Sequence, residues 1–298
     1  MPADQPPTLR LELLKEAKLT ELLGEELGAR LEASGVLAKD GCFYVIFDNS
    51  PDIARIGGEL AREDAGNRLI RQEQRRDGGY EDIAYDRTEG HFYVLVEAVP
   101  HPGGGFMAQV REHDEGFRHL SDAWMDFPLD RPNKGLEGLT CVRRAGRTHL
   151  LGLCEGNRCR AGAEGRRPGG GRIQVFARTP RRWDRVGTIR LPESLWFEDY
   201  SSLAVAGDRV AVVSQASSAL WVGRLSPSRW ELADEGTTYG FPLDAKGRTV
   251  YCTVEGVSWV ADDRVVVVSD KAKAGAQHQR CRAKDQSIHL FALPGAAP

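Results

Sequence analysis

The sequence lacks a long apolar run, and its N-terminus has no apolar core of signal-peptide length behind a basic start. A membrane-spanning helix needs about 20 mostly apolar residues, so no membrane segment is expected. These absences predict a soluble, cytoplasmic protein. Cysteine is also scarce, with 6 in 298 residues. That number is too small for a disulfide scaffold and agrees with a reducing compartment.

The common catalytic motifs are also missing. The 7 histidines follow no triad spacing, and there is no GxSxG elbow, P-loop or Rossmann glycine pattern. These absences argue against acyl-enzyme, nucleotide-dependent and hydride-transfer chemistry. No complete set of zinc ligands accompanies Cys154, Cys159 and Cys281, so partly buried thiols are expected there, with Cys252 in the core. The 40 basic and 43 acidic residues nearly balance, which argues against general nucleic-acid binding.

What the sequence does contain is 33 glycines, 15 prolines and a repeated strand pattern. The clearest copy runs from Tyr251 to Lys271. In it, a Glu-Gly pair enters one strand, an Asp-Asp turn follows, and a β-branched strand ends on Ser269 and Asp270. Weaker copies occur upstream, at steps of 47 to 64 residues. The copies span residues 32–49, 80–98, 136–157, 200–215 and 251–271.

A third strand follows each copy, and a fourth strand fits before the next copy. Four antiparallel strands per repeat form the blade of a β-propeller. We therefore predict an all-β protein, a single β-propeller domain over residues 1–298 with five four-stranded blades. A sandwich or barrel also has many short strands, but it does not require one acidic motif at a period of about fifty residues. Candidate fourth strands are Arg68–Gln72, Phe117–Phe127, Trp183–Leu191 and Trp230–Glu235.

The fifth copy runs out of chain after its third strand. Thr8–Leu19 precedes the first copy and could supply the missing outer strand, which would close the ring. The same segment has apolar residues at helical spacing, so residues 1–30 form either a closing strand or a helix. A helix would favour a sixth, divergent blade. Two insertions, 158–171 and 271–284, follow equivalent strands and are expected to be surface loops on one face.

Residues that recur at one point of each copy should form a ring around the central channel. The first predicted ring comprises Ser34, Glu81, Glu137, Ser201 and Glu255, and the second comprises Asp48, Asn49, Glu97, Glu155, Gln215 and Asp270. Facing carboxylates repel one another unless a cation intervenes. Oxygen ligands suit Ca²⁺ better than Mg²⁺, which tends to keep its waters. The predicted metal ligands are Glu81, Glu137, Glu255, Asp48, Glu97, Glu155 and Asp270.

The alternative role for these acids is structural, because a motif acid can simply accept N–H bonds from the neighbouring blade. Two lysines near the motif acids are relevant to the choice between metal binding and a structural role. Lys134 and Lys271 each lie within 3 residues of a motif acid. There they could meet an anionic substrate or pair with the acids themselves.

The motifs YEDIAYD, LEGLTCV, YSSLAVAGD and VEGVSWV resemble those of phytase-like β-propellers, in particular the SdiA-regulated group. The resemblance extends from about Glu32 to Leu293. It implies a propeller fold and, in the phytase branch, hydrolysis of phosphate esters with calcium bound at acidic clusters. The sequence lacks the signal peptide that is common in secreted phytases, which argues against phytate as the substrate.

These observations predict a divalent-cation-dependent hydrolase of a small anionic ester, with a phosphoester as the first candidate and the site at the channel mouth. Glu137, Glu255, Glu155 and Asp270 would hold the ion, with Glu137 and Glu255 also acting in catalysis. Lys134 or Lys271 would meet the anion. The alternative is a non-catalytic propeller that binds a small ligand or a protein through the same mouth.

Overall fold

The structure is a computed structural model that describes residues 7–24, 31–72, 79–129, 131, 135–273 and 275–295, with the side chain of Glu97 excepted. Strands dominate this part of the chain. Its helical segments are short: α1 (Leu19–Leu23), α2 (Gly162–Gly165) and 3-10 turns at Asn157–Cys159 and Gln279–Ala283. None of these described helices has the length and apolar character that crossing a membrane requires.

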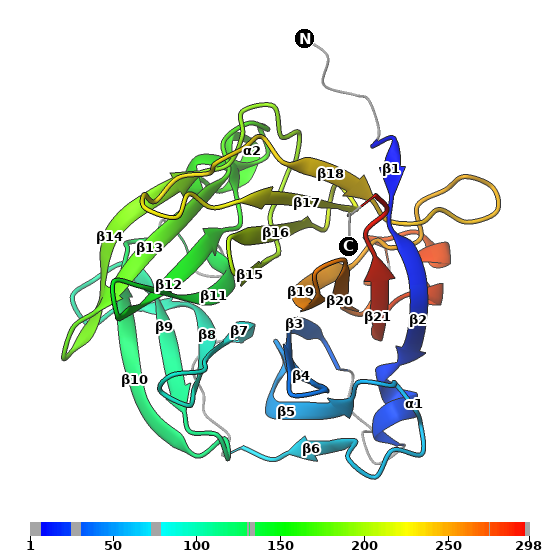
Figure 1. Ribbon diagram of the computed structural model, residues 1–298, viewed down its shortest axis with the longest axis horizontal. Helices are drawn as coiled ribbons and strands as arrows, with labels where there is room; N and C mark the ends of the chain where they lie inside the picture. Colours follow the sequence, from blue (N-terminus) through cyan, green and yellow to red (C-terminus); the bar gives the residue numbers. More distant parts are fainter. Residues whose placement is uncertain are drawn as a thin grey trace.

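The described strands group into five blades of four antiparallel strands around a common centre (Figure 1). This arrangement confirms the predicted β-propeller. Blade 1 contains β3 (Ala33–Lys39), β4 (Cys42–Phe47), β5 (Ser50–Gly57) and β6 (Arg68–Ile70). Blade 2 contains β7 (Tyr80–Asp86), β8 (His91–Pro100), β9 (Phe106–His113) and β10 (His119–Asp126). Blade 3 contains β11 (Leu136–Arg144), β12 (Arg147–Cys154), β13 (Arg172–Arg178) and β14 (Arg182–Arg190).

Blade 4 contains β15 (Ser202–Ala206), β16 (Arg209–Ser214), β17 (Ala219–Arg224) and β18 (Thr237–Gly240). Blade 5 contains β19 (Val254–Ala261), β20 (Arg264–Ser269), β21 (Ser287–Ala292) and, from the N-terminal region, β2 (Glu12–Lys18). The first strand of each blade lies nearest the centre in Figure 1, and the fourth lies at the perimeter. The predicted closure of the ring by an N-terminal strand is therefore confirmed, and the helical alternative holds only for the five residues of α1.

Two outer-strand features differ from the sequence prediction. The fourth strand of blade 4 is Thr237–Gly240, whereas the predicted segment Trp230–Glu235 contributes only an isolated bridge between Leu232 and Leu225. The reason is that Trp230 is drawn toward blade 3, where the Arg144 guanidinium lies 3.9 Å from its ring centroid. In addition, β1 (Leu9–Arg10) pairs in parallel with β18, and β10 pairs in parallel with β14, which joins blades 2 and 3 into one sheet.

The core consists of apolar layers between neighbouring blades. Along β20, Val265 and Val267 pack toward blade 4, whereas Val266 and Val268 pack toward blade 1. Because both faces of a middle strand are covered, its sequence is a continuous apolar run instead of an alternating one. This is why RVVVVS is such a strong strand signal.

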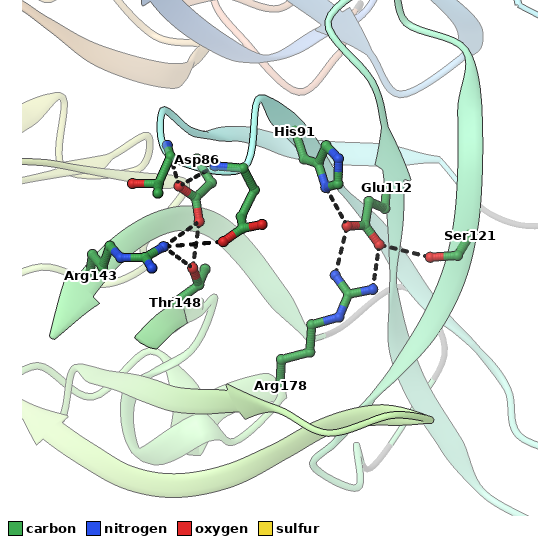
Figure 2. A network of polar contacts seen from close by, with 9 residues as sticks. Asp86, His91, Glu112, Ser121, Arg143, Thr148 and Arg178 are labelled. Carbon is green, nitrogen blue, oxygen red and sulfur yellow. Dashed lines mark hydrogen bonds and ion pairs between the residues drawn. The ribbon is translucent and has the colours of Figure 1, made fainter. Parts of the chain in front are cut away.

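Polar contacts also join the blades. Glu112 on β9 accepts two bonds from the Arg178 guanidinium of blade 3, at 2.7 and 2.6 Å, and further contacts from His91 and Ser121 (Figure 2). The Glu112 side chain is only 7% exposed, so each carboxylate oxygen needs these partners. The network accounts for Glu112 structurally and ties blade 2 to blade 3.

The hub is filled by the residues that align at the start of the inner strands. Asp82 is 1% exposed and accepts bonds from the Leu139 N–H of blade 3 and the Ser202 hydroxyl of blade 4, both at 2.9 Å. Ser202 in turn accepts the Val257 N–H of blade 5 at 3.2 Å. Gly35 of blade 1 completes the hub, because a Cβ there would lie 2.8 Å from the Asp82 carboxylate. One carboxylate thus connects the inner strands of all the blades.

Four of the cysteines form disulfides, which corrects the prediction of thiols. Cys154 bonds Cys159, and Cys252 bonds Cys281, with Cα–Cα distances of 5.1 and 5.6 Å. The second pair is 29 residues apart in sequence and becomes adjacent only because loop 271–284 folds back to the entrance of β19. The scarcity of cysteine is therefore no argument for a reducing compartment.

Candidate functional site

β-Bulges at the start of the inner strands orient the first ring. The strand register shifts between Ala33 and Gly35, and it shifts equivalently at Glu81, Glu137 and Glu255. A bulge adds one residue to its strand and turns that side chain out of the regular alternation. The repeated motif therefore sets the direction of the ring residues as well as their position.

The serines of this ring serve the fold. The Ser34 hydroxyl donates to the Tyr80 carbonyl of blade 2, and the Ser201 hydroxyl donates to the Val254 carbonyl of blade 5. The structural role that the sequence left open for the acids is filled by Asp82, the residue after Glu81. Glu81 itself is 9% exposed.

Glu255 is the centre of an acidic cluster formed with Glu137, Asp270 and Asp199. Burial raises its pKa well above the usual range, and the charges of Glu137, Asp270 and Asp199 raise it further, whereas Lys273 opposes them. The Gln215 amide donates to Oε1 of Glu255. The structure thus brings the charges of three predicted ring acids together, and the pKa of one of them, Glu255, is raised.

Lys273 is the cation that acts on this cluster. Its charge bears on Glu255 and also on Asp48, whose pKa is raised by desolvation and by Glu32. Lys271, the predicted lysine, places its backbone N–H against the Asp270 carboxylate. Lys134 and the side chain of Glu97 lie outside the described residues, so their predicted roles stay predictions.

A cavity of about 890 Å³, here called the mouth cavity, opens beside the cluster. Glu155, Asp199 and Gln215 line it together with residues of both long loops. Asp199 accepts the Ser214 hydroxyl at 2.6 Å and the Ala216 N–H at 3.0 Å, which fixes its carboxylate at the wall. Both loops therefore border one cavity, on the same face of the ring.

The lining of the mouth cavity also carries arginines, which together are called its cationic rim. Cationic side chains on the rim come from the connection before blade 3 and from the two loops. They are Arg131, Arg160, Arg166 and Arg280. Each disulfide anchors one of the loops: Cys154–Cys159 holds the start of the first, and Cys252–Cys281 holds the second. The position of the cationic rim therefore depends on both covalent links.

The acids do not assemble into a metal site as they stand. Within the described part of the chain, no three His, Cys, Asp or Glu side chains are arranged to hold one ion. The Gln215 amide donates to Glu255, and the charge of Lys273 opposes the repulsion between the carboxylates. The calcium binding expected from the sequence stays a prediction.

Asp199 and Lys273 are the cluster members that the sequence interpretation missed. Asp199 precedes the ring serine by two residues, and Lys273 follows the predicted Lys271 by two. The acid-rich segment FEDYSS and the repeated lysine in SDKAK are the available signals. Neither shows which of the neighbouring charges faces the channel.

The sequence matches no protein-family model, and no curated protein matches it. Solved structures with the same architecture do exist. A glutaminyl cyclase from Myxococcus xanthus superposes with a TM-score of 0.57 at 11% identity, covering 97% of this chain and 99% of that one. A GH43_1 enzyme from Xanthomonas citri complexed with xylotriose superposes with a TM-score of 0.51 at 12% identity, covering 93% and 89%. At such identities the similarity establishes a shared β-propeller fold and nothing about activity.

Proposed function

We propose that this protein is a hydrolase that binds a small anionic ester in the mouth cavity and uses Glu255 as a general acid. The observation that carries the proposal is the contact between Glu255, whose pKa is raised by burial and by neighbouring carboxylates, and Gln215, which lines a cavity with a cationic rim. Glycosidases and other acid–base enzymes hold one carboxyl group protonated next to an ionised one in this way. Two of the similar propellers are named as enzymes, so the fold accommodates catalysis elsewhere.

Each group then has a defined task. Glu255 donates its Oε2 proton to the leaving-group oxygen, while Gln215 keeps the carboxyl oriented through Oε1. Asp199, fixed at the cavity wall by Ser214 and Ala216, accepts a proton from the attacking water. Lys273 limits the repulsion that the new negative charge on Glu255 meets after proton transfer.

The substrate class follows from the rim. The arginines attract an anion from solution and can bind a phosphate or carboxylate group by paired N–H bonds. A volume of about 890 Å³ suits a small molecule. The resemblance to phytase-like propellers supports a phosphoester, but the described acids offer no metal ligand set, so no step of the mechanism passes through a cation.

The experiment is turnover of glycerol 2-phosphate and ethyl acetate, whose alkoxide leaving groups require a proton, in the presence of a chelator. Replacing Glu255 by Gln should lower kcat by about 10²- to 10⁴-fold, the usual contribution of a positioned acid. Glu59→Gln is the matched control, because the Glu59 side chain is 90% exposed. Turnover by the wild type that Glu255→Gln leaves unchanged would refute the assignment. Binding of an anion without turnover would favour the non-catalytic alternative.

A further inference from the structure

A second cavity, of about 430 Å³, lies between the inner strands of all five blades, which surround the centre of the ring in Figure 1. Each inner strand contributes residues that follow its hub position: 36–39 of β3, 83–86 of β7, 139–141 of β11, 203–206 of β15 and 257–259 of β19. The ring acids precede the hub positions on the same strands. The hub therefore separates this cavity, here called the base cavity, from the acidic cluster around Glu255.

The wall of the base cavity is largely apolar, and part of it stays accessible. Its partly exposed apolar side chains come from four different blades: Leu37, Tyr85, Val205 and Trp259. The Nζ atom of Lys39 lies 4.6 Å from the centroid of the Tyr85 ring, and the Trp259 indole N–H donates to the Ala204 carbonyl at 3.3 Å. These contacts hold both aromatic rings at the wall. A preformed wall of this kind is typical of small-molecule sites.

Two neutral hydroxyl groups interrupt the apolar wall. In the part of the chain that the structure describes, the Thr140 hydroxyl makes no hydrogen bond, and its oxygen retains accessible surface. The Ser258 hydroxyl accepts the Ala38 N–H at 3.0 Å, so its own proton can still be donated. Neighbouring Cys141 adds no charge, because burial raises the pKa of its thiol to about 12. A ligand with a hydroxyl or carbonyl oxygen would complete the hydrogen bonding of this wall.

The charges around the base cavity are balanced, in contrast to the cationic rim of the mouth cavity. The charged residues of its lining are Lys39, Asp86, Arg87 and Arg143. The side-chain nitrogens of Lys39 and Arg87 lie 2.5 and 3.9 Å from the Asp40 carboxylate. Arg143 lies 3.3 Å from Glu89 and 4.0 Å from Asp86. Because each of these cations already has a carboxylate beside it, the cavity offers no net charge to offset the desolvation of an ionic ligand.

We infer that the base cavity binds a small uncharged molecule with a flat, mainly aromatic body and one hydroxyl or carbonyl group. The body covers the partly exposed apolar side chains, and the oxygen pairs with the Thr140 hydroxyl. A volume of about 430 Å³ is near the lower end for ligand pockets, so a ligand that fills the cavity contacts several inner strands at once. The balanced charges distinguish this ligand from the anionic ester proposed for the mouth cavity.

The test is fluorescence titration of the full chain with Prodan, an uncharged naphthalene ketone whose emission shifts to shorter wavelength in apolar surroundings. Prodan should bind saturably and show this shift. Thr140→Val keeps the shape of the side chain and removes the hydroxyl, so the affinity should fall by about two- to tenfold, as expected for one neutral hydrogen bond. An unchanged affinity in Thr140→Val would contradict the inferred hydrogen bond.

A pair of matched variants locates the dye. Ala206 lines the base cavity and is partly exposed, so Ala206→Trp fills space that the dye needs and should weaken binding by about tenfold or more. Ala216→Trp places the same side chain at the mouth cavity and should leave the affinity for Prodan unchanged. Binding that is lost in Ala216→Trp and retained in Ala206→Trp would put the dye at the mouth and overturn the inference.

Displacement of Prodan tests the charge of the ligand. Uncharged 2-naphthol should displace the dye at concentrations at which anionic 2-naphthoate does not. Equal displacement by the two compounds would overturn the inference, and so would failure of the wild type to bind Prodan. None of these measurements depends on turnover at Glu255.

Discussion

Asp82 is the residue on which the hub most depends. Its carboxylate accepts from Leu139 and Ser202 and is surrounded by inner strands. Asp82→Ala should destabilise the protein by about 3–5 kcal/mol, because several buried donors lose their acceptor together. Urea unfolding followed by fluorescence measures the change. Asp262→Ala, at a side chain 94% exposed, should change stability by less than about 0.5 kcal/mol. A small effect at Asp82 would contradict its role as a link between blades.

Glu255 gives a prediction about pH. Its pKa is raised in the folded state, so the folded protein binds this proton more tightly than the unfolded chain does. The stabilisation that the Glu255 proton contributes is fully present at acidic pH. It is lost as pH rises through the pKa of Glu255 in the folded state. Glu255→Gln keeps the shape of the protonated carboxyl group but cannot lose a proton. The melting temperature of this variant should therefore rise relative to that of the wild type as pH rises toward neutrality. A difference that stays flat with pH would show that the pKa is not raised.

At the scale of single residues, the sequence predicts which motif acids form the cluster around Glu255, but not the direction in which each side chain points. Glu137, Glu255 and Asp270 were predicted from the repeat, and the structure brings their charges together. Glu81 and Asp82 are adjacent acids, and only the bulge decides which of them enters the hub. A shift of one residue reverses the direction of a side chain in a strand. Pattern alone therefore cannot separate a hub acid from a mouth acid.

The two disulfides are expected to stabilise the protein by different amounts. Cys252–Cys281 spans 29 residues and Cys154–Cys159 spans 5, so the first restricts the unfolded chain more. Replacing Cys252 and Cys281 by Ser should cost about 2–4 kcal/mol in the free energy of unfolding, and replacing the other pair should cost less. Urea titration under non-reducing conditions compares them, with the free Cys42→Ser as control. The reverse order would contradict the expected dependence on loop length.

Element prediction succeeded where both faces of a strand are buried. The middle strands are continuous apolar runs and were placed correctly, as was the closing strand Glu12–Lys18. The fourth strand of blade 4 was misplaced, because outer strands are half exposed and their positions depend on contacts such as that of Trp230 with Arg144. The cysteine pairs were missed because their partners meet only through loop geometry.

The integrity of the whole ring depends on β2. It pairs with β21 and carries the chain into α1, whose Leu19 and Leu22 are buried between blades 1 and 5. A chain without residues 1–24 should lose at least about 3–5 kcal/mol of stability, as expected when several core leucines are removed. Adding a peptide of residues 7–24 should restore the melting temperature, whereas a scrambled peptide should not. Equal stability of the truncated and full-length chains would show that closure contributes little.

The same pairing fixes when the molecule can be completed during its synthesis. Glu16 meets His289, which lies 273 residues further along the chain. β2 therefore leaves the ribosome 273 residues before its partner emerges. Domains usually begin to fold from the N-terminal side as they are made, and partly finished β structures aggregate through exposed apolar faces and strand edges. We expect a long-lived intermediate in the cell in which β2 and β21 have not yet paired and the ring is open. The nascent chain should need chaperone protection until β21 is released.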